Sequence, residues 1–139
     1  MKILLDSNVW VAGFATRGLC ADLLQCLLRL HEEDECSVLV CPAVQSEVIR
    51  ILRDKIGLDP LDLHRVEIIM GRMEAVADGR WSPPPGFPDP GDVPIVGAAL
   101  HAAAAWLVTG DAALQALETV ESVQILSPRA AFLHLRGLA

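Results

Sequence analysis

Short apolar runs alternate with longer amphipathic segments along the whole chain. The short runs stop at polar residues, proline or glycine, as buried strands do, and predict strands at residues 2–5, 37–41, 106–109 and 123–126. The longer segments carry apolar residues at helical spacing and predict helices at 19–30, 43–56, 60 to about 76, 93–105, just after 111, and from 128. Strands that alternate with helices predict an α/β fold with three layers, in which a central parallel sheet of about four to five strands has helices on both faces.

Length and composition indicate a single domain spanning residues 1–139. The chain has 139 residues, of which 53% are hydrophobic and 21% charged, and neither a repeat nor a change in composition divides it. Its longest nearly apolar run, residues 95–108, contains His101 and is shorter than the roughly 20 residues that a bilayer span needs. Asp6 follows the first apolar run too early for a signal peptide. We therefore expect no membrane association and a cytoplasmic protein.

Four acidic residues have positions that favour convergence. Asp6 directly follows the first strand, and Asp111 follows the third strand after one glycine, so both lie where the carboxyl ends of parallel strands meet. Asp92 begins an alanine-rich helix after an irregular proline-rich segment, residues 78–92. Glu47 falls at the border of the apolar stripe of its helix. Taken singly, Asp92 is also explained as a helix cap and Glu47 as a boundary residue, whereas together the four predict a common pocket.

A pocket of four carboxylates favours a bound cation. Each pair of like charges 4 Å apart costs roughly 1 kcal/mol in water and about 4 kcal/mol at an effective dielectric of 20. No lysine or arginine stands within three positions of Asp6, Asp92 or Asp111, and the net charge is −7. Ligands that are all oxygen favour Mg²⁺ or Mn²⁺, ions that support phosphodiester hydrolysis. The negative charge argues against a broad basic face for duplex DNA, while nine arginines leave a short phosphate contact open.

The ordered motifs around these acids resemble those of the PIN-domain ribonucleases, and especially of the VapC-type toxins of bacterial toxin–antitoxin pairs. The stretch Ile-Leu-Leu-Asp6-Ser-Asn8 is similar to their first motif, and Pro42 with Ser46-Glu47-Val-Ile is similar to their second. Asp92, ahead of a helix of small residues, resembles the third motif, and Val-Thr109-Gly-Asp111 resembles the fourth. The resemblance covers nearly the whole chain.

The resemblance implies a PIN fold and the hydrolysis of single-stranded or structured RNA in a pocket of Asp6, Glu47, Asp92 and Asp111. These four acids would act as the catalytic residues and hold Mg²⁺ or Mn²⁺ directly or through water. Asn8 and Thr109 would orient them, and Asp89 is a spare ligand because Gly91 stands where close relatives often carry another aspartate. The resemblance also implies a cognate antitoxin protein and a homodimer as partners.

Other classes of protein account for the sequence less well. A receiver-like phosphoacceptor domain requires a lysine beyond a late strand, and the chain has only Lys2 and Lys55. A phosphatase of the haloacid-dehalogenase type requires Asp-x-Asp after the first strand, and position 8 is asparagine. The remaining alternative is a catalytically degenerate PIN fold that serves as a scaffold for binding protein or RNA.

Overall fold

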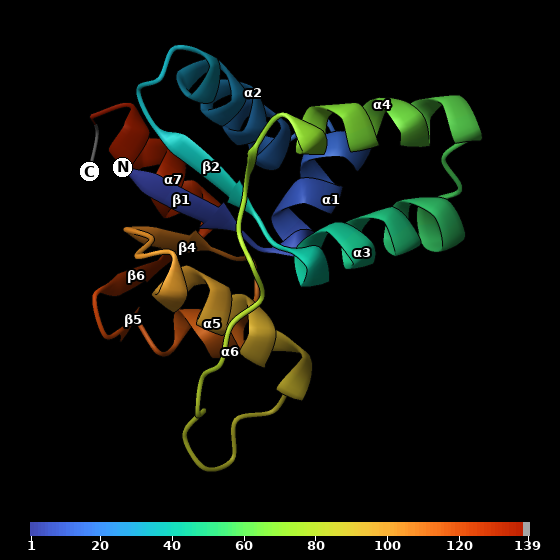
Figure 1. The fold of residues 1–139 in the computed structure, drawn as a ribbon. Helices are drawn as coiled ribbons and strands as arrows, with labels where there is room; N and C mark the ends of the chain where they lie inside the picture. The colour runs from blue at the N-terminus through green and yellow to red at the C-terminus, as the bar shows by residue number, and fades with distance from the viewer. Residues whose placement is uncertain (138–139) are drawn as a thin grey trace.

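The computed structural model describes residues 1–137, and its centre is a six-stranded sheet (Figure 1). The strands lie in the order β3-β2-β1-β4-β6-β5. They are β1 (Lys2–Leu5), β2 (Ser37–Val40), β3 (Glu74–Ala75), β4 (Trp106–Val108), β5 (Thr119–Val120) and β6 (Val123–Leu126). The helices are α1 (Ser7–Ala15), α2 (Leu19–Glu32), α3 (Pro42–Ile51), α4 (Pro60–Gly71), α5 (Val93–His101), α6 (Ala112–Gln115) and α7 (Pro128–Leu135), with a π-helical turn η1 (Leu52–Ile56) and a 3-10 turn η2 (Pro90–Asp92).

The pairing of the strands confirms the predicted α/β fold class. Strands β3, β2, β1, β4 and β6 are all parallel, whereas β5 pairs with β6 in the antiparallel direction. The four strands that the sequence predicts occupy the middle of the sheet. The two edge strands, β3 and β5, were not predicted, because two residues are too few to show an alternating pattern. The first strand in the chain, β1, therefore lies in the middle of the sheet, with parallel neighbours on both sides.

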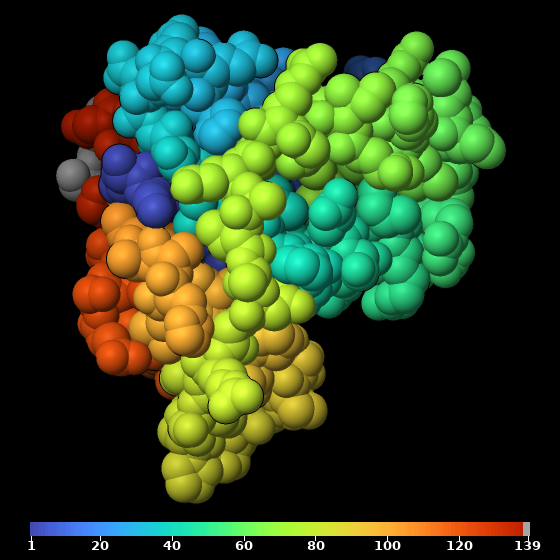
Figure 2. All heavy atoms as spheres, viewed as in Figure 1, coloured from blue at the N-terminus to red at the C-terminus, as the bar shows by residue number. Residues whose placement is uncertain are grey.

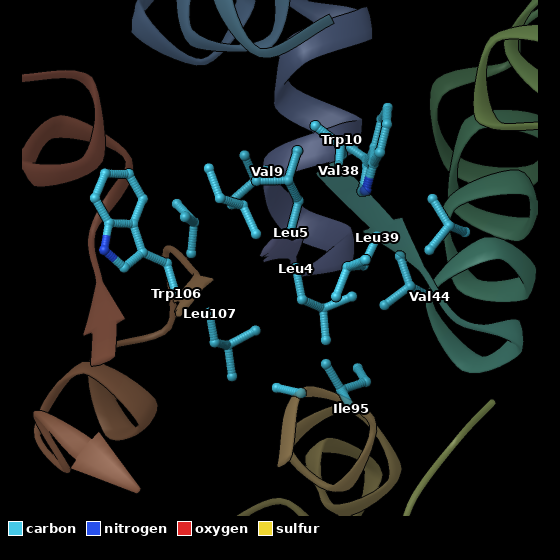
Figure 3. Close-up of a cluster of buried hydrophobic side chains, with 14 of the residues drawn as sticks. Leu4, Leu5, Val9, Trp10, Val38, Leu39, Val44, Ile95, Trp106 and Leu107 are labelled. Carbon is cyan, nitrogen blue, oxygen red and sulfur yellow. The ribbon is translucent and has the colours of Figure 1, made fainter. Parts of the chain in front are cut away.

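The helices cover both faces of the sheet, and alternate side chains of β1 pack against different helices. Leu4 and its register partner Leu107 face Ile95 of α5 (Figure 3). Leu5 points to the opposite face, where Val9 of α1 lies (Figure 3). Because both faces are covered, β1 and its neighbours are apolar without alternation. The largest side chains that are fully buried are Trp10, Ile3, Leu4, Leu5, Leu23, Leu27, Leu39, Leu52, Ile95, Leu107 and Leu114.

Several helix boundaries differ from those expected. The helix predicted from residue 60 to about 76 ends at Gly71 and is followed by β3. The helix predicted at 93–105 ends at His101, and the one at 43–56 changes from α to π geometry after Ile51. Helix α1 was not predicted, and Asp6 caps it by accepting a hydrogen bond from the Ser7 amide. Nine residues with little segregation of apolar and polar positions give a weak periodic signal.

No single helix in residues 1–137 is long and apolar enough to cross a membrane. Helices α1 and α2 satisfy the length and composition of a span only when taken together, and they meet at 104°. Both place apolar side chains in the core, including Val9 and Trp10 from α1 and Leu23 and Leu27 from α2.

The segment that follows β3 crosses α5 in direct contact with its backbone. The amide of Val76 donates to the carbonyl of Val40 at 2.9 Å, and the amide of Gly79 donates to the carbonyl of Pro94 at 3.1 Å. A Cβ atom added to Gly97 would lie 2.2 Å from the Gly79 carbonyl carbon. Because neither glycine has a side chain, the backbone of the crossing segment can approach the backbone of α5 this closely. Beyond the crossing the chain projects from the body of the molecule before it returns to Asp92 (Figures 1 and 2).

We expect Gly97→Ala to destabilise the protein by about 1–3 kcal/mol or more, because the new methyl group meets backbone atoms that cannot rotate away. Urea unfolding of the purified variant measures this loss. Gly71→Ala, at the end of α4, is the matched control, since a Cβ there has no neighbour within 4 Å. Equal stability of the two variants would show that the crossing segment moves away easily.

Candidate active site

The fold brings the four predicted acids to the carboxyl edge of the sheet. Asp6 lies between β1 and α1, and Asp111 lies between β4 and α6. Asp92 joins the turn η2 to α5, whose N-terminus is at this edge because α5 runs antiparallel to the strands. Glu47 lies in α3, the helix that begins directly after β2 (Figure 1).

Asp6 is held by hydrogen bonds to both oxygens of its carboxylate. Oδ1 accepts from the Ser7 amide at 2.8 Å and from the Ser7 hydroxyl at 3.4 Å. Oδ2 accepts from the Thr109 hydroxyl at 2.7 Å and from the side-chain Nδ2 of Asn8 at 3.3 Å. Asp6 is only 3% exposed. These donors fix the carboxylate in one orientation.

Thr109 connects the first strand of the chain to the β4–α6 loop. Its hydroxyl donates to Asp6 and accepts from the Asp111 amide at 3.0 Å. Asn8 closes the same loop from the other side, since its Oδ1 accepts from the Gly110 amide at 2.9 Å. Asp111 itself caps α6, with Oδ1 accepting from the Ala113 amide at 2.8 Å. Asn8 and Thr109 thus hold Asp6 and the loop that carries Asp111 in place by hydrogen bonds.

Asp92 is the least satisfied acid of the group. Its side chain is buried, with 8% of the residue exposed, and its Oδ2 has no hydrogen-bond partner among the described residues. Burial raises the pKa of Asp92 to about 7, with a further contribution from the charges of Asp6, Asp89 and Asp111. Burial also raises the pKa of Asp6, against the hydrogen bonds from Thr109 and Ser7 that lower it. Two neighbouring carboxyls therefore resist ionisation when no cation is present.

Glu47 and Asp89 contribute charge to the site from its margin. Glu47 is half-buried, and its charge contributes to the raised pKa of Asp6. Asp89 is exposed, and its Oδ1 accepts from the Gly91 amide at 2.8 Å, which shapes the turn before Asp92. Within residues 1–137, no three Asp, Glu, His or Cys side chains form a group placed to contact one metal ion together. The acids thus interact through their charges without forming a closed coordination sphere.

The site also contains two residues that sequence reasoning missed. Ser7 donates to Asp6 from both its amide and its hydroxyl. Gln115 donates from Nε2 to the Thr109 carbonyl at 2.7 Å and so stabilises the loop that carries Asp111. The succession Asp6-Ser7 is itself a signal for a helix cap, and recognising it would have predicted both α1 and this contact.

The acidic side chains are gathered at the carboxyl ends of the parallel strands, which is where α/β sheets bind their ligands. A family model described as PIN domain matches residues 2–113, and the chain belongs to the PIN-domain family. PIN domains are generally nucleases, and they generally use divalent metal ions. The matched region contains all four acids, with Asn8, Asp89 and Thr109. A search of curated proteins found no match.

Proposed function

We propose that the protein is a metal-dependent endoribonuclease, in which Asp6, Glu47, Asp92 and Asp111 hold Mg²⁺ or Mn²⁺ and single-stranded or structured RNA is hydrolysed. The observation that carries this proposal is the buried Oδ2 of Asp92, which has no hydrogen-bond partner in the described part of the chain. A buried carboxylate oxygen without a donor, close to other acids, loses the stabilisation that water would give it. A divalent cation would supply that stabilisation to the acids it contacts, directly or through its waters.

The donor set fits Mg²⁺ or Mn²⁺ better than a softer ion. All the candidate ligands are carboxylate oxygens, and no histidine or cysteine completes a group with them in residues 1–137. Mg²⁺ keeps several of its waters and is commonly bound by only one or two carboxylates. The open arrangement of these acids suits such a hydrated ion, with some of the acids acting through water.

The residues of the chain have distinct parts in this proposal. When bound, a divalent ion supplies activation of water and stabilises negative charge on the phosphate and the leaving oxygen. Thr109 and Asn8 orient Oδ2 of Asp6, while the Ser7 amide holds Oδ1. Asp111 uses Oδ1 to cap α6, which leaves its other oxygen for the ion. Asp92, whose pKa is about 7 without metal, would be favoured in its carboxylate form by a bound cation.

Thermal melting in EDTA, Mg²⁺ or Mn²⁺ tests the metal site independently of any substrate. An ion at 100 times its dissociation constant stabilises the folded chain by about 2.7 kcal/mol. We expect Mg²⁺ or Mn²⁺ to raise the melting temperature of the wild type. The rise should be smaller in Glu47→Gln, because glutamine carries no negative charge to attract the ion. Glu32→Gln is the control, since Glu32 is an exposed residue at the end of α2.

If the metal-dependent rise in melting temperature is the same in Glu47→Gln as in the wild type, Glu47 does not belong to the metal site. No increase in the wild type would contradict the metal site and favour a catalytically degenerate scaffold. Cleavage of a labelled single-stranded RNA, with and without EDTA, then tests the reaction.

We propose further that this nuclease is the cytoplasmic toxin of a type II toxin–antitoxin pair and that it forms a homodimer. Leu61 and Ile68 support a protein-binding surface on α4, because they are 60% and 43% exposed. An arginine or lysine of the antitoxin would enter the acidic pocket. Co-expression with the product of an adjacent gene tests the pairing, with suppression of RNA cleavage as the expected result.

A further inference from the structure

A groove with two arginines runs along α3, the helix that carries Glu47. Its volume is about 390 Å³, and its lining includes Gln45, Ser46, Arg50 and Arg53 from α3 and η1, together with Glu67 from α4. Helices α3 and α4 lie side by side and extend away from the sheet (Figures 1 and 2). The groove therefore lies between these two helices, along the length of α3.

Arg50 is the basic residue of this groove that is free to bind a ligand. Arg53 already contacts Asp54, at 2.8 Å from Nε and 3.2 Å from Nη2. Arg50 is exposed and forms neither an ion pair nor a hydrogen bond with any residue that the structure describes. Gln45 and Ser46 are also exposed and add an amide and a hydroxyl donor. The groove thus offers one unpaired guanidinium with neutral donors beside it, and the carboxylate of Glu67 lies on its α4 side.

The position of Arg50 relative to Glu47 connects the groove to the site. Residues three apart on a helix have Cβ atoms about 5–6 Å from each other, so Arg50 lies one turn beyond Glu47. None of the other three acids has a lysine or arginine within three positions. A polyanionic substrate is repelled by the acids and by a net charge of −7, and it needs cations close to the site to bind.

We propose that this groove binds the phosphates of single-stranded RNA next to the cleaved bond, with Arg50 as the main phosphate ligand. The inference rests on the proposed function and assigns the path of the RNA over one face of the molecule. A guanidinium makes two parallel hydrogen bonds to a phosphate, and Gln45 and Ser46 donate to the same backbone. The contact is made to phosphate alone and is therefore independent of base sequence.

The salt dependence of RNA binding tests this inference. Binding of a fluorescein-labelled single-stranded RNA of mixed sequence is followed by anisotropy over a series of salt concentrations, with Asp6→Asn in the full chain to prevent cleavage. The slope of log K against log salt is negative, and each lost phosphate contact makes it less steep by about 0.7 for a single strand. We expect Asp6→Asn/Arg50→Ala to bind RNA more weakly than Asp6→Asn and to have a slope that is less steep by about 0.7. Arg50→Lys in the same background keeps the charge and is expected to retain the slope.

Arg129→Ala is the matched control, because Arg129 is exposed on α7, away from the groove. It is expected to leave the slope unchanged. The same slope and affinity for Arg50→Ala and Arg129→Ala would overturn the inference about the groove, while RNA cleavage by the wild type would still support the proposed function. A wild-type chain that neither cleaves nor binds RNA would overturn both.

Discussion

Asp6→Asn is expected to abolish RNA cleavage while the protein remains folded. Residues that only orient a metal ligand cost about 10–100-fold in activity when they are replaced, so the loss of a ligand at the centre of the site should exceed about 100-fold. Asparagine keeps an oxygen that can accept from the Ser7 amide, and the cap of α1 is therefore preserved. Cleavage of labelled RNA in Mg²⁺, together with circular dichroism of the variant, measures both effects.

Asp22→Asn is the control for this experiment, because Asp22 is an exposed residue in the first turn of α2. It removes the same charge from the chain without entering the acidic pocket, and its cleavage rate is expected to match the wild type. Retained cleavage by Asp6→Asn would exclude Asp6 from the mechanism.

Without metal, the protein is expected to lose stability as the pH rises towards 7. The pKa of Asp92 is about 7 in the folded chain, whereas an aspartate in an unfolded chain has a pKa of about 3.9. Between these values the folded state holds a proton that the unfolded state has released. The free energy of unfolding therefore falls with pH by at most about 1.4 kcal/mol per unit and becomes level above pH 7. The raised pKa of Asp6 acts in the same direction.

Asp92→Asn is expected to remove most of this pH dependence and to raise stability at pH 8 in EDTA by roughly 1–3 kcal/mol. The substitution removes a buried charge whose Oδ2 accepts no hydrogen bond from the described residues, so little is lost. Thermal melts from pH 5 to pH 8 measure the effect. The gain on adding Mg²⁺ should become smaller in the variant. A variant less stable than the wild type at pH 8 would show that the Asp92 charge is favourably placed.

The parts of the site that were predictable are those set by the ends of strands. Asp6 and Asp111 follow short apolar runs that predict buried strands, and parallel strands bring their carboxyl ends to one edge. Asp92 and Glu47 were placed by the helices on which they stand. The hydrogen bonds of the site were harder to predict from the sequence, because the contact of Asp6 with Thr109 spans 103 residues.

The features that escaped prediction depend on single close contacts between distant segments. His31 is an example, since its Nδ1 accepts from the Val38 amide at 3.0 Å and its Nε2 donates to the Arg72 carbonyl at 3.0 Å. One imidazole ring thereby connects α2, β2 and the end of α4. The crossing of Gly79 over Gly97 is another, and neither histidine spacing nor glycine content indicated these partners.

The central position of β1 also determines when the pocket can form during synthesis. The amide of Asp6 donates to the carbonyl of Val108 at 2.9 Å, and its carboxylate accepts from the hydroxyl of Thr109. Both partners belong to a later part of the chain. A nascent chain that has emerged only as far as α4 contains Asp6 and Glu47 but lacks β4, Asp92 and Asp111. Contacts this distant in sequence form late, because a long loop must close first. A ribosome-bound nascent chain therefore carries no assembled acidic pocket until β4 and Asp111 have emerged.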